Sequence, residues 1–264
     1  MYNDVKKIKE DKKIMDFHPM PRYLMRKHAI RKILKKLPCK NKDLLELGYG
    51  AGEIFPTYLK LGINCYGFDF SEEAYHYAIA NMKNNTGSIT LYKKEQEING
   101  RKYDFVVACE VLEHMEDDAQ ALLDWKSHLK DEGMFLLSVP AHQNRWDYAD
   151  ISVGHFRRYE KDKLTELLYK SGLQVKVFYT YDFPSCYILD PIRAKKTEKI
   201  YSLASNTRTA KEDFTKVSGI KRDQNKFFRL LSNKYLLYPI IKFQELFYKC
   251  DLGSAYIILC EKIK

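Results

Sequence analysis

Residues 46–52 are Glu46-Leu47-Gly48-Tyr49-Gly50-Ala51-Gly52, an acidic residue followed by three glycines at two-residue intervals. The apolar run that leads into them predicts a strand, and the glycines allow a sharp turn and a close approach to a ligand, because a Cβ would clash there or forbid a positive φ. A dinucleotide site requires its third glycine at position 53, where Glu53 stands instead. A carboxylate is an unfavourable neighbour for a pyrophosphate, so the loop favours another ligand.

The rest of the chain alternates short apolar runs with helical patterns. Helical spacing is found over residues 53–61, 72–83, 116–130 and 160–171, and strands that alternate with helices indicate a parallel sheet covered on both faces. We therefore expect an α/β, doubly wound, seven-stranded and mainly parallel sheet. The seven predicted strands lie at residues 43–50, 63–70, 88–93, 103–112, 133–140, 173–181 and 254–263.

Four segments follow from this pattern. Residues 1–43 are expected to form a basic N-terminal extension, with an amphipathic helix over residues 21–37 whose Arg and Lys side chains face away from its apolar stripe. Residues 44–183 form the expected core, residues 184–252 a helical insertion or lid, and residues 253–264 the last core strand.

The net charge of +10 is concentrated in the two flanking segments, whereas the core carries a net negative charge. Basic flanks favour an anionic partner, a membrane surface or a charged substrate, although solvated helix faces would explain the same charges. The six cysteines are scattered, with no spacing typical of a zinc site, so we expect reduced thiols and no metal. Without a signal peptide or a long apolar run, we expect a cytoplasmic protein, either soluble or membrane-peripheral.

The second predicted strand ends at Asp69, which is followed by Phe70. A carboxylate at the end of that strand can accept hydrogen bonds from both hydroxyl groups of a ribose. An alternative is that Asp69 caps the helix that begins near Ser71, and the two roles are compatible.

The glycine loop, Asp69 and residues 103–114 (YDFVVACEVLEH) together resemble class I S-adenosylmethionine-dependent methyltransferases, in the broad methyltransferase type 11 family that includes the ubiquinone-biosynthesis O-methyltransferases. The resemblance covers residues 44–183 and 253–264 and implies S-adenosylmethionine as the cofactor. It does not identify the substrate. The cofactor-binding residues that the resemblance implies are Glu46, Gly48, Tyr49, Gly50 and Gly52 at the methionine half, Asp69 and Phe70 at the ribose, Glu95 or Gln96 at the adenine, Cys109 and Glu110 beside the sulfonium, and His114 beneath the cofactor.

Acceptor recognition is expected after the fifth strand, in residues 139–159, because ligands of open α/β sheets lie beyond the carboxyl ends of the strands. His142 and His155 are the candidate general bases, which a hydroxyl acceptor would need and an unprotonated amine would not. Arg157 and Arg158 could alternatively pair with core carboxylates such as Asp150. The candidate substrate contacts are Trp146, Asp150, Arg157 and Tyr159.

The insertion contains large aromatic residues and lysines over residues 227–248, with Pro239 expected to break or kink a helix. Such a segment could close over a pocket, lie in a bilayer interface or contact a second subunit in a homodimer. The Lys-rich residues 193–199 are expected to be solvated, or to help hold a phosphate.

We expect methyl transfer to an oxygen or nitrogen atom of a small metabolite that is anionic. The alternatives are a peripheral methyltransferase of a lipid or lipid-linked glycan, an RNA methyltransferase, and a non-catalytic scaffold with the same fold. Nucleic acid is an unfavoured partner, because no RNA-binding module is evident.

Overall fold

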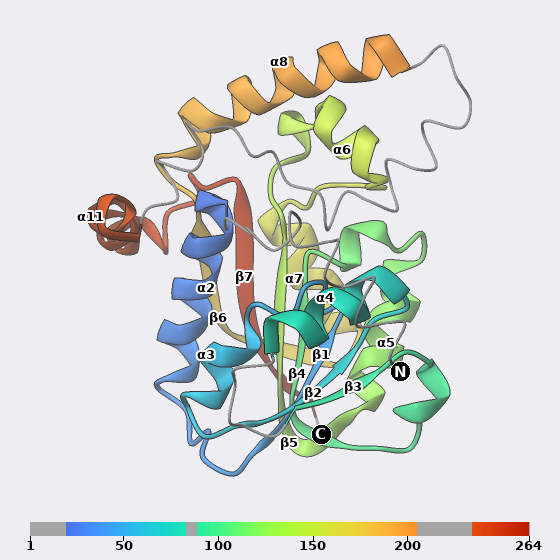
Figure 1. The fold of residues 1–264 in the computed structure, drawn as a ribbon. Coiled ribbons are helices and arrows are strands. Elements are labelled where there is room, and N and C mark those ends of the chain that lie inside the picture. Colours follow the sequence, from blue (N-terminus) through green and yellow to red (C-terminus); the bar gives the residue numbers. More distant parts are fainter. Residues whose placement is uncertain (1–19, 83–88, 205–233, 264) are drawn as a thin grey trace.

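The computed structural model describes residues 20–82, 89–204 and 234–263, with a seven-stranded sheet at the centre (Figure 1). The strand order is β3-β2-β1-β4-β5-β7-β6, and all neighbours pair in parallel except β7, which runs antiparallel to both β5 and β6. The mainly parallel sheet predicted from the sequence is confirmed. Its strands are β1 (Asp43–Leu47), β2 (Asn64–Phe68), β3 (Ile89–Tyr92), β4 (Tyr103–Cys109), β5 (Leu129–Pro140), β6 (Leu173–Tyr181) and β7 (Ala255–Lys262).

Helices cover both faces of the sheet. On one face lie α2 (Pro21–Leu34), α3 (Phe55–Leu59) and α4 (Glu72–Met82), and on the other lie α5 (Asp118–Ser127) and α7 (Lys161–Lys170). Successive strand residues point to opposite faces, so Leu44 and Leu136 pack in the first core while Leu45 and Leu137 pack in the second. Strands buried on both sides must be apolar throughout, which is why their sequences stood out.

The parallel strands end at one edge of the sheet, and the extra elements gather there (Figure 1). Short 3-10 turns follow three of these strands: η2 (Glu95–Glu97) after β3, η3 (Leu112–His114) after β4 and η4 (Gln143–Arg145) after β5. The helix α6 (Tyr148–Val153) comes next and packs against α8 (Cys186–Ala204) from the insertion. The helices α6 and α8 therefore cover this edge of the sheet, on the side of the glycine loop.

The second part of the insertion comprises α11 (Lys234–Gln244) and the turn η5 (Glu245–Phe247), and α11 packs against α2. Residues 205–233 lie outside the described part of the chain, so the expected segment over residues 227–248 is described from Lys234 onward. The helix continues past Pro239, which does not end it. Within the described ranges, no helix has both the length and the apolar character required to cross a membrane.

Candidate functional site

The glycine loop after β1 has the backbone that its sequence predicts. Gly48, Gly50 and Gly52 have φ angles of 67°, 54° and 70°, in the left-handed region that other residues avoid. A Cβ on Gly48 would also lie 2.6 Å from Cγ2 of Val111, the residue before η3. Glycine is thus required at this position both for the turn and for the close packing of β1 against the segment after β4.

Asp69 connects this loop to β2. One of its carboxylate oxygens accepts a hydrogen bond from the Gly50 N–H at 2.9 Å, and the other accepts one from the Ser71 N–H at 2.9 Å. Burial raises the pKa of Asp69, and these two backbone donors partly oppose the rise. Each carboxylate oxygen keeps a second lone pair, so Asp69 can hold the loop and accept a ligand's hydroxyl hydrogen at the same time.

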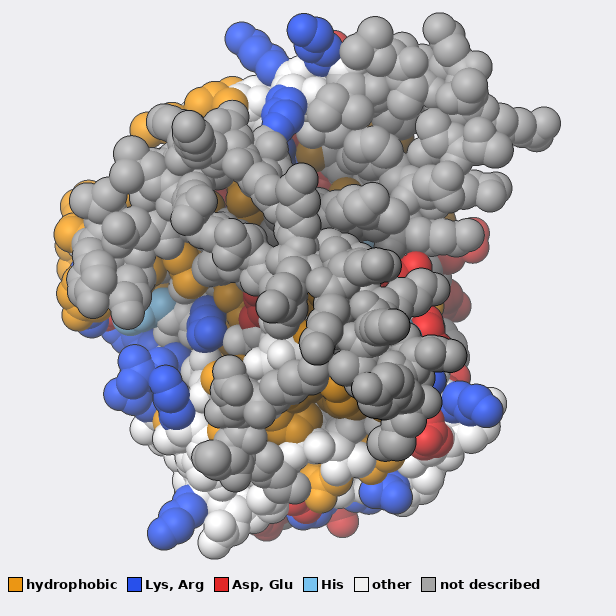
Figure 2. Space-filling model, in the orientation of Figure 1, with side chains coloured by type: hydrophobic (Ala, Val, Ile, Leu, Met, Phe, Trp, Pro, Cys, Tyr) orange, Lys and Arg blue, Asp and Glu red, His pale blue; other side chains and the backbone are white. Residues whose placement is uncertain are grey.

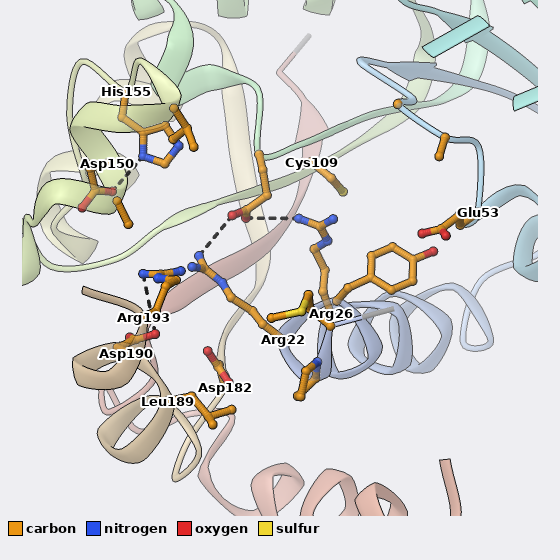
Figure 3. A pocket seen from close by; sticks show the side chains of 18 of the residues that line it. Arg22, Arg26, Glu53, Cys109, Asp150, His155, Asp182, Leu189, Asp190 and Arg193 are labelled. Carbon is orange, nitrogen blue, oxygen red and sulfur yellow. Dashed lines mark hydrogen bonds and ion pairs between the residues drawn. The ribbon is translucent and has the colours of Figure 1, made fainter. Parts of the chain in front are cut away.

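A cavity of about 610 Å³ opens beside the loop (Figure 3). Its wall is built from five parts of the chain: α2, the glycine loop, the end of β4, the α6 region, and α8 with the residue after β6. Of the predicted cofactor-binding residues, the cavity lining includes Glu46, Gly48, Tyr49, Gly50, Cys109 and Glu110.

Glu46 on β1 is a buried acid in this wall. Its Oε2 atom has no hydrogen-bond partner among the described residues, and burial raises its pKa to about 8. Arg26 and the Tyr58 hydroxyl favour the charged form, but burial and the nearby Asp69 outweigh them and disfavour an ionised Glu46. The unsatisfied oxygen is therefore suited to a ligand that has a positively charged amine.

Glu110, directly after β4, is surrounded by donors. Arg22 contacts Oε2 at 3.1 Å and Arg26 contacts Oε1 at 3.4 Å, while the hydroxyl groups of Ser138 and Tyr181 donate to Oε1 at 2.8 and 3.1 Å. Burial alone would raise the pKa of Glu110, but the two guanidinium groups and the Ser138 hydroxyl outweigh it and hold the pKa at about 2. Glu110 is a fixed negative charge that positions both arginines in the cavity (Figure 3).

These arginines correct the sequence-based interpretation of α2. The Arg and Lys side chains of this helix were expected to face away from the core, yet Arg22 and Arg26, one turn apart, line the cavity. The apolar stripe lies at Met25, Ala29, Ile30, Ile33 and Leu34. The composition of the helix gave no indication of Glu110, the distant partner that draws the two arginines inward.

His155 lies in the opposite wall, beneath α6. Its Nδ1 is 2.8 Å from Oδ1 of Asp150, and Asp150 also accepts hydrogen bonds from Arg158 Nε and Nη2 at 2.7 to 3.0 Å. Burial would raise the pKa of Asp150, but the contacts with His155 and Arg158 hold it well below its ordinary value. The sequence predicted that Arg157 and Arg158 could pair with core carboxylates such as Asp150, and the pairing of Arg158 with Asp150 is confirmed.

A second group of titratable side chains surrounds His155. Glu113 is fully buried without a hydrogen-bond partner for either carboxylate oxygen among the described residues, and Oε1 lies 3.7 Å from His155 Nε2. Burial raises the pKa of Glu113 and lowers the pKa of His114 to about 4. Ligand atoms of Glu113, His114 and His155 lie within 4.8 Å of one another, a grouping that the spacing of these residues in the sequence did not indicate.

The helix α8 closes the cavity opposite the glycine loop. Arg193, Lys196 and Asp190 line this end, and Arg193 Nη2 lies 3.6 Å from Asp190 Oδ1. Arg193 Nε and Asp190 Oδ2 are buried without a hydrogen-bond partner in the described part of the chain. Both an unsatisfied donor and an unsatisfied acceptor therefore belong to this wall. Arg193 lies in the Lys-rich segment 193–199 that was expected to be solvated or to hold a phosphate, whereas Asp190 precedes that segment.

Several predicted residues lie outside the cavity lining. His142 contacts Glu160 at 3.7 Å and Asp251 at 3.5 Å, and its ring stacks edge-on against Tyr256. Arg157 pairs with Asp118, and the buried Tyr159 hydroxyl donates to the same residue. These contacts explain the positions of the three side chains without a ligand. Gly52, Asp69, Phe70, Glu95, Gln96, His114 and Trp146 also lie outside the lining, and their predicted roles stay predictions.

Comparison with known proteins identifies a family. The profile of the family described as "Methyltransferase domain" matches residues 19–176, more than half of the chain. A ubiquinone biosynthesis O-methyltransferase of Rickettsia conorii is 29% identical over 129 residues, which cover 44% of this chain and 45% of that protein. The Rickettsia canadensis protein of the same name is 26% identical over 149 residues, covering 51% and 63%. The chain thus matches about half of the length of these curated relatives.

Solved structures share the fold at low sequence identity. The 1,6-didemethyltoxoflavin-N1-methyltransferase of Burkholderia thailandensis, determined with its substrate and S-adenosylhomocysteine bound, has a TM-score of 0.54 at 13% identity and covers all of this chain and 84% of its own. A cyclopropane synthase of Mycobacterium tuberculosis has a TM-score of 0.56 at 13% identity, covering 94% and 87%.

The ion pairs of Glu110 predict a pH-dependent stability. Its pKa of about 2 in the folded protein lies below the value of about 4.3 in an unfolded chain, so its stabilisation is present above that value and is lost as the pH falls towards 2. We expect Glu110→Gln to lower the free energy of unfolding at neutral pH. The difference in this free energy between the variant and the wild type is expected to narrow as the pH falls from about 4.3 towards about 2. Urea denaturation over a pH series measures it, and a difference that stays constant into acid would contradict the assignment.

Proposed function

The chain belongs to the methyltransferase-domain family, and from this premise we propose that it transfers the methyl group of S-adenosylmethionine to an oxygen or nitrogen atom of a small anionic metabolite. The observation that carries the proposal is the buried carboxylate of Glu46 beside the left-handed glycine loop, whose Oε2 atom has no hydrogen-bond partner among the described residues. It supports a ligand that has a cationic amine next to the loop, as the methionine half of this cofactor has.

The residues around the loop fit the methionine half and the ribose of the cofactor. Glu46 would accept from its ammonium group, and Arg26, in the same wall, would pair with its carboxylate. Asp69 would accept from the ribose hydroxyl groups with the lone pairs that the Gly50 and Ser71 N–H groups leave free. The bound cofactor supplies an electrophilic methyl group on a sulfonium.

The α8 end of the cavity supports an acceptor with two kinds of polar group. The unpartnered Arg193 Nε favours an anionic oxygen, and the unpartnered Asp190 Oδ2 favours a hydroxyl or amine hydrogen. A metabolite that has a carboxylate or phosphate near a hydroxyl or amine would satisfy both atoms. Lys196, in the same wall, adds positive charge to this end.

In the proposed mechanism the chain's own residues position the acceptor, exclude water and remove a proton. The apolar residues Ile30, Ile54 and Ile192 in the cavity lining limit the access of water. Asp150 would accept a hydrogen bond from the Nδ1–H group of His155, which leaves Nε2 as the basic atom that takes the proton of a hydroxyl acceptor. Arg158 keeps Asp150 ionised and so fixes the ring in that orientation.

Cofactor binding is tested by calorimetric titration of the wild type and Asp69→Ala with S-adenosylmethionine and S-adenosylhomocysteine. We expect wild-type binding and a loss of affinity of at least about tenfold in the variant, because charge-assisted hydrogen bonds to the ribose disappear. Asp131→Ala, which removes a carboxylate from a 94% exposed side chain, is the matched control. A folded wild type that binds neither compound would overturn the assignment and favour a non-catalytic scaffold.

The choice of base is tested by comparing His155→Asn with His142→Asn. Compounds with a carboxylate beside a hydroxyl or amine are screened with a labelled methyl donor, and kcat is measured on a hydroxyl acceptor found in this way. We expect His155→Asn to lower kcat by about 100-fold or more, a typical effect of losing a general base, and His142→Asn to retain activity. Equal binding of S-adenosylhomocysteine by the two variants shows that both cofactor sites are intact. The reverse order of activities would transfer the role to His142.

A further inference from the structure

A continuous apolar surface joins α8 to α11. The rings of Phe243 and Phe247 lie 5.1 Å apart, Phe247 lies 4.6 Å from Phe183, and Phe183 lies 5.9 Å from Tyr187. Leu246, in the turn between Phe243 and Phe247, is 74% exposed. We call these five residues, together with the exposed Tyr238, Ile188 and Ile240, the α8–α11 surface.

Packing among the described residues does not account for this surface. The face of α11 towards the protein buries Leu237 and Ile241, and Tyr248 after η5 is buried as well, stacked on Tyr179. Tyr238 and Phe243 project from other sides of the same helix and are about half exposed. A surface helix of a globular protein normally has polar residues on its outer face, so apolar residues on both faces indicate a second apolar environment.

Basic residues adjoin the α8–α11 surface. Residues 21–37 contain no acidic residue, and Arg31, Lys35 and Lys36 of this segment are exposed. Glu245 of η5 joins α11 to α2, because His28, Lys32 and Lys242 all contact its carboxylate. The two lysines outnumber the single acid, so this junction has a net positive charge. Figure 2 shows that hydrophobic and basic side chains lie next to each other on this side of the molecule.

We propose that the α8–α11 surface and the adjoining basic face of α2 bind the surface of an anionic lipid bilayer. Exposed aromatic and aliphatic side chains enter the boundary between headgroups and acyl chains, and neighbouring lysines are attracted to anionic headgroups. Protein interfaces also use aromatic residues but are depleted of lysine, so this mixture favours a bilayer over a protein partner. The inference does not depend on the proposed methyl transfer.

The experiment is vesicle flotation of the full chain. Vesicles of phosphatidylcholine alone are compared with an equimolar mixture of phosphatidylcholine and phosphatidylglycerol. The wild type is expected to float with the anionic vesicles and not with the neutral ones, and high salt releases it. Leu246→Ser lowers the partition coefficient by about tenfold or more, because one leucine side chain no longer enters the apolar part of the bilayer. Separately, the double variant Lys35→Glu, Lys36→Glu lowers it by about 30-fold or more, since each nearby lysine contributes about one kcal/mol to membrane attraction.

Matched controls come from α7, on the other face of the sheet. Tyr169 is 67% exposed and Lys163 is exposed, so Tyr169→Ser and Lys163→Glu make similar changes away from the proposed surface and leave flotation unchanged. Circular dichroism of each variant shows that it is folded. The proposal is overturned if the wild type does not float with anionic vesicles, or if the control variants lose binding as Leu246→Ser does. It is also overturned if sedimentation velocity shows a dimer that Leu246→Ser dissociates while vesicles are not bound.

Discussion

The ion pairs from Arg22 and Arg26 to Glu110 are the interaction on which the cavity depends. Glu110 stands at the end of β4, the arginines come from α2, and the additional donors Ser138 and Tyr181 come from β5 and β6. One carboxylate thus fixes four parts of the chain around a single point. Charges with limited access to water are costly unless their hydrogen bonds are made. Both oxygens of Glu110 have donors here, whereas Arg22 Nε is buried without a hydrogen-bond partner in the described part of the chain.

The sequence predicted the features that depend on local pattern. The seven strands appeared as apolar runs because both faces of the sheet are buried, and the glycine loop appeared because left-handed backbone at Gly48 and Gly52 requires that residue. It did not predict α6, which spans six residues and is too short to show a helical period. The inward direction of Arg22 and Arg26 was missed for a different reason, since it depends on a partner 84 or more positions away.

The two candidate bases show that residue type alone does not identify a general base. His142 and His155 lie in the same segment and were equivalent on sequence alone. Their neighbours distinguish them, because His155 lines the cavity with Asp150 at its Nδ1, whereas His142 packs against Tyr256 between two other acids.

The helix α8 connects the site to the outer surface. Leu189 and Arg193 line the cavity while Tyr187 and Ile188 are exposed, so the wall that would recognise the acceptor adjoins the proposed bilayer surface.

The central claim is that α2 supplies the cationic side of a site for S-adenosylmethionine. Its most direct test is equilibrium dialysis of the labelled cofactor with variants of the otherwise wild-type chain, in which Glu110 still directs both arginines into the cavity. Glu110→Gln alone is a separate arm that measures the effect of losing this carboxylate. Arg22→Gln with Arg26→Gln is compared with Lys35→Gln and Lys36→Gln, which remove the same charge from two exposed residues directly after α2. The account predicts that the arginine changes weaken binding by about tenfold to 100-fold, as expected for the loss of a charge-assisted pair, and that the lysine changes do not. Equal affinity in the two variants would contradict it.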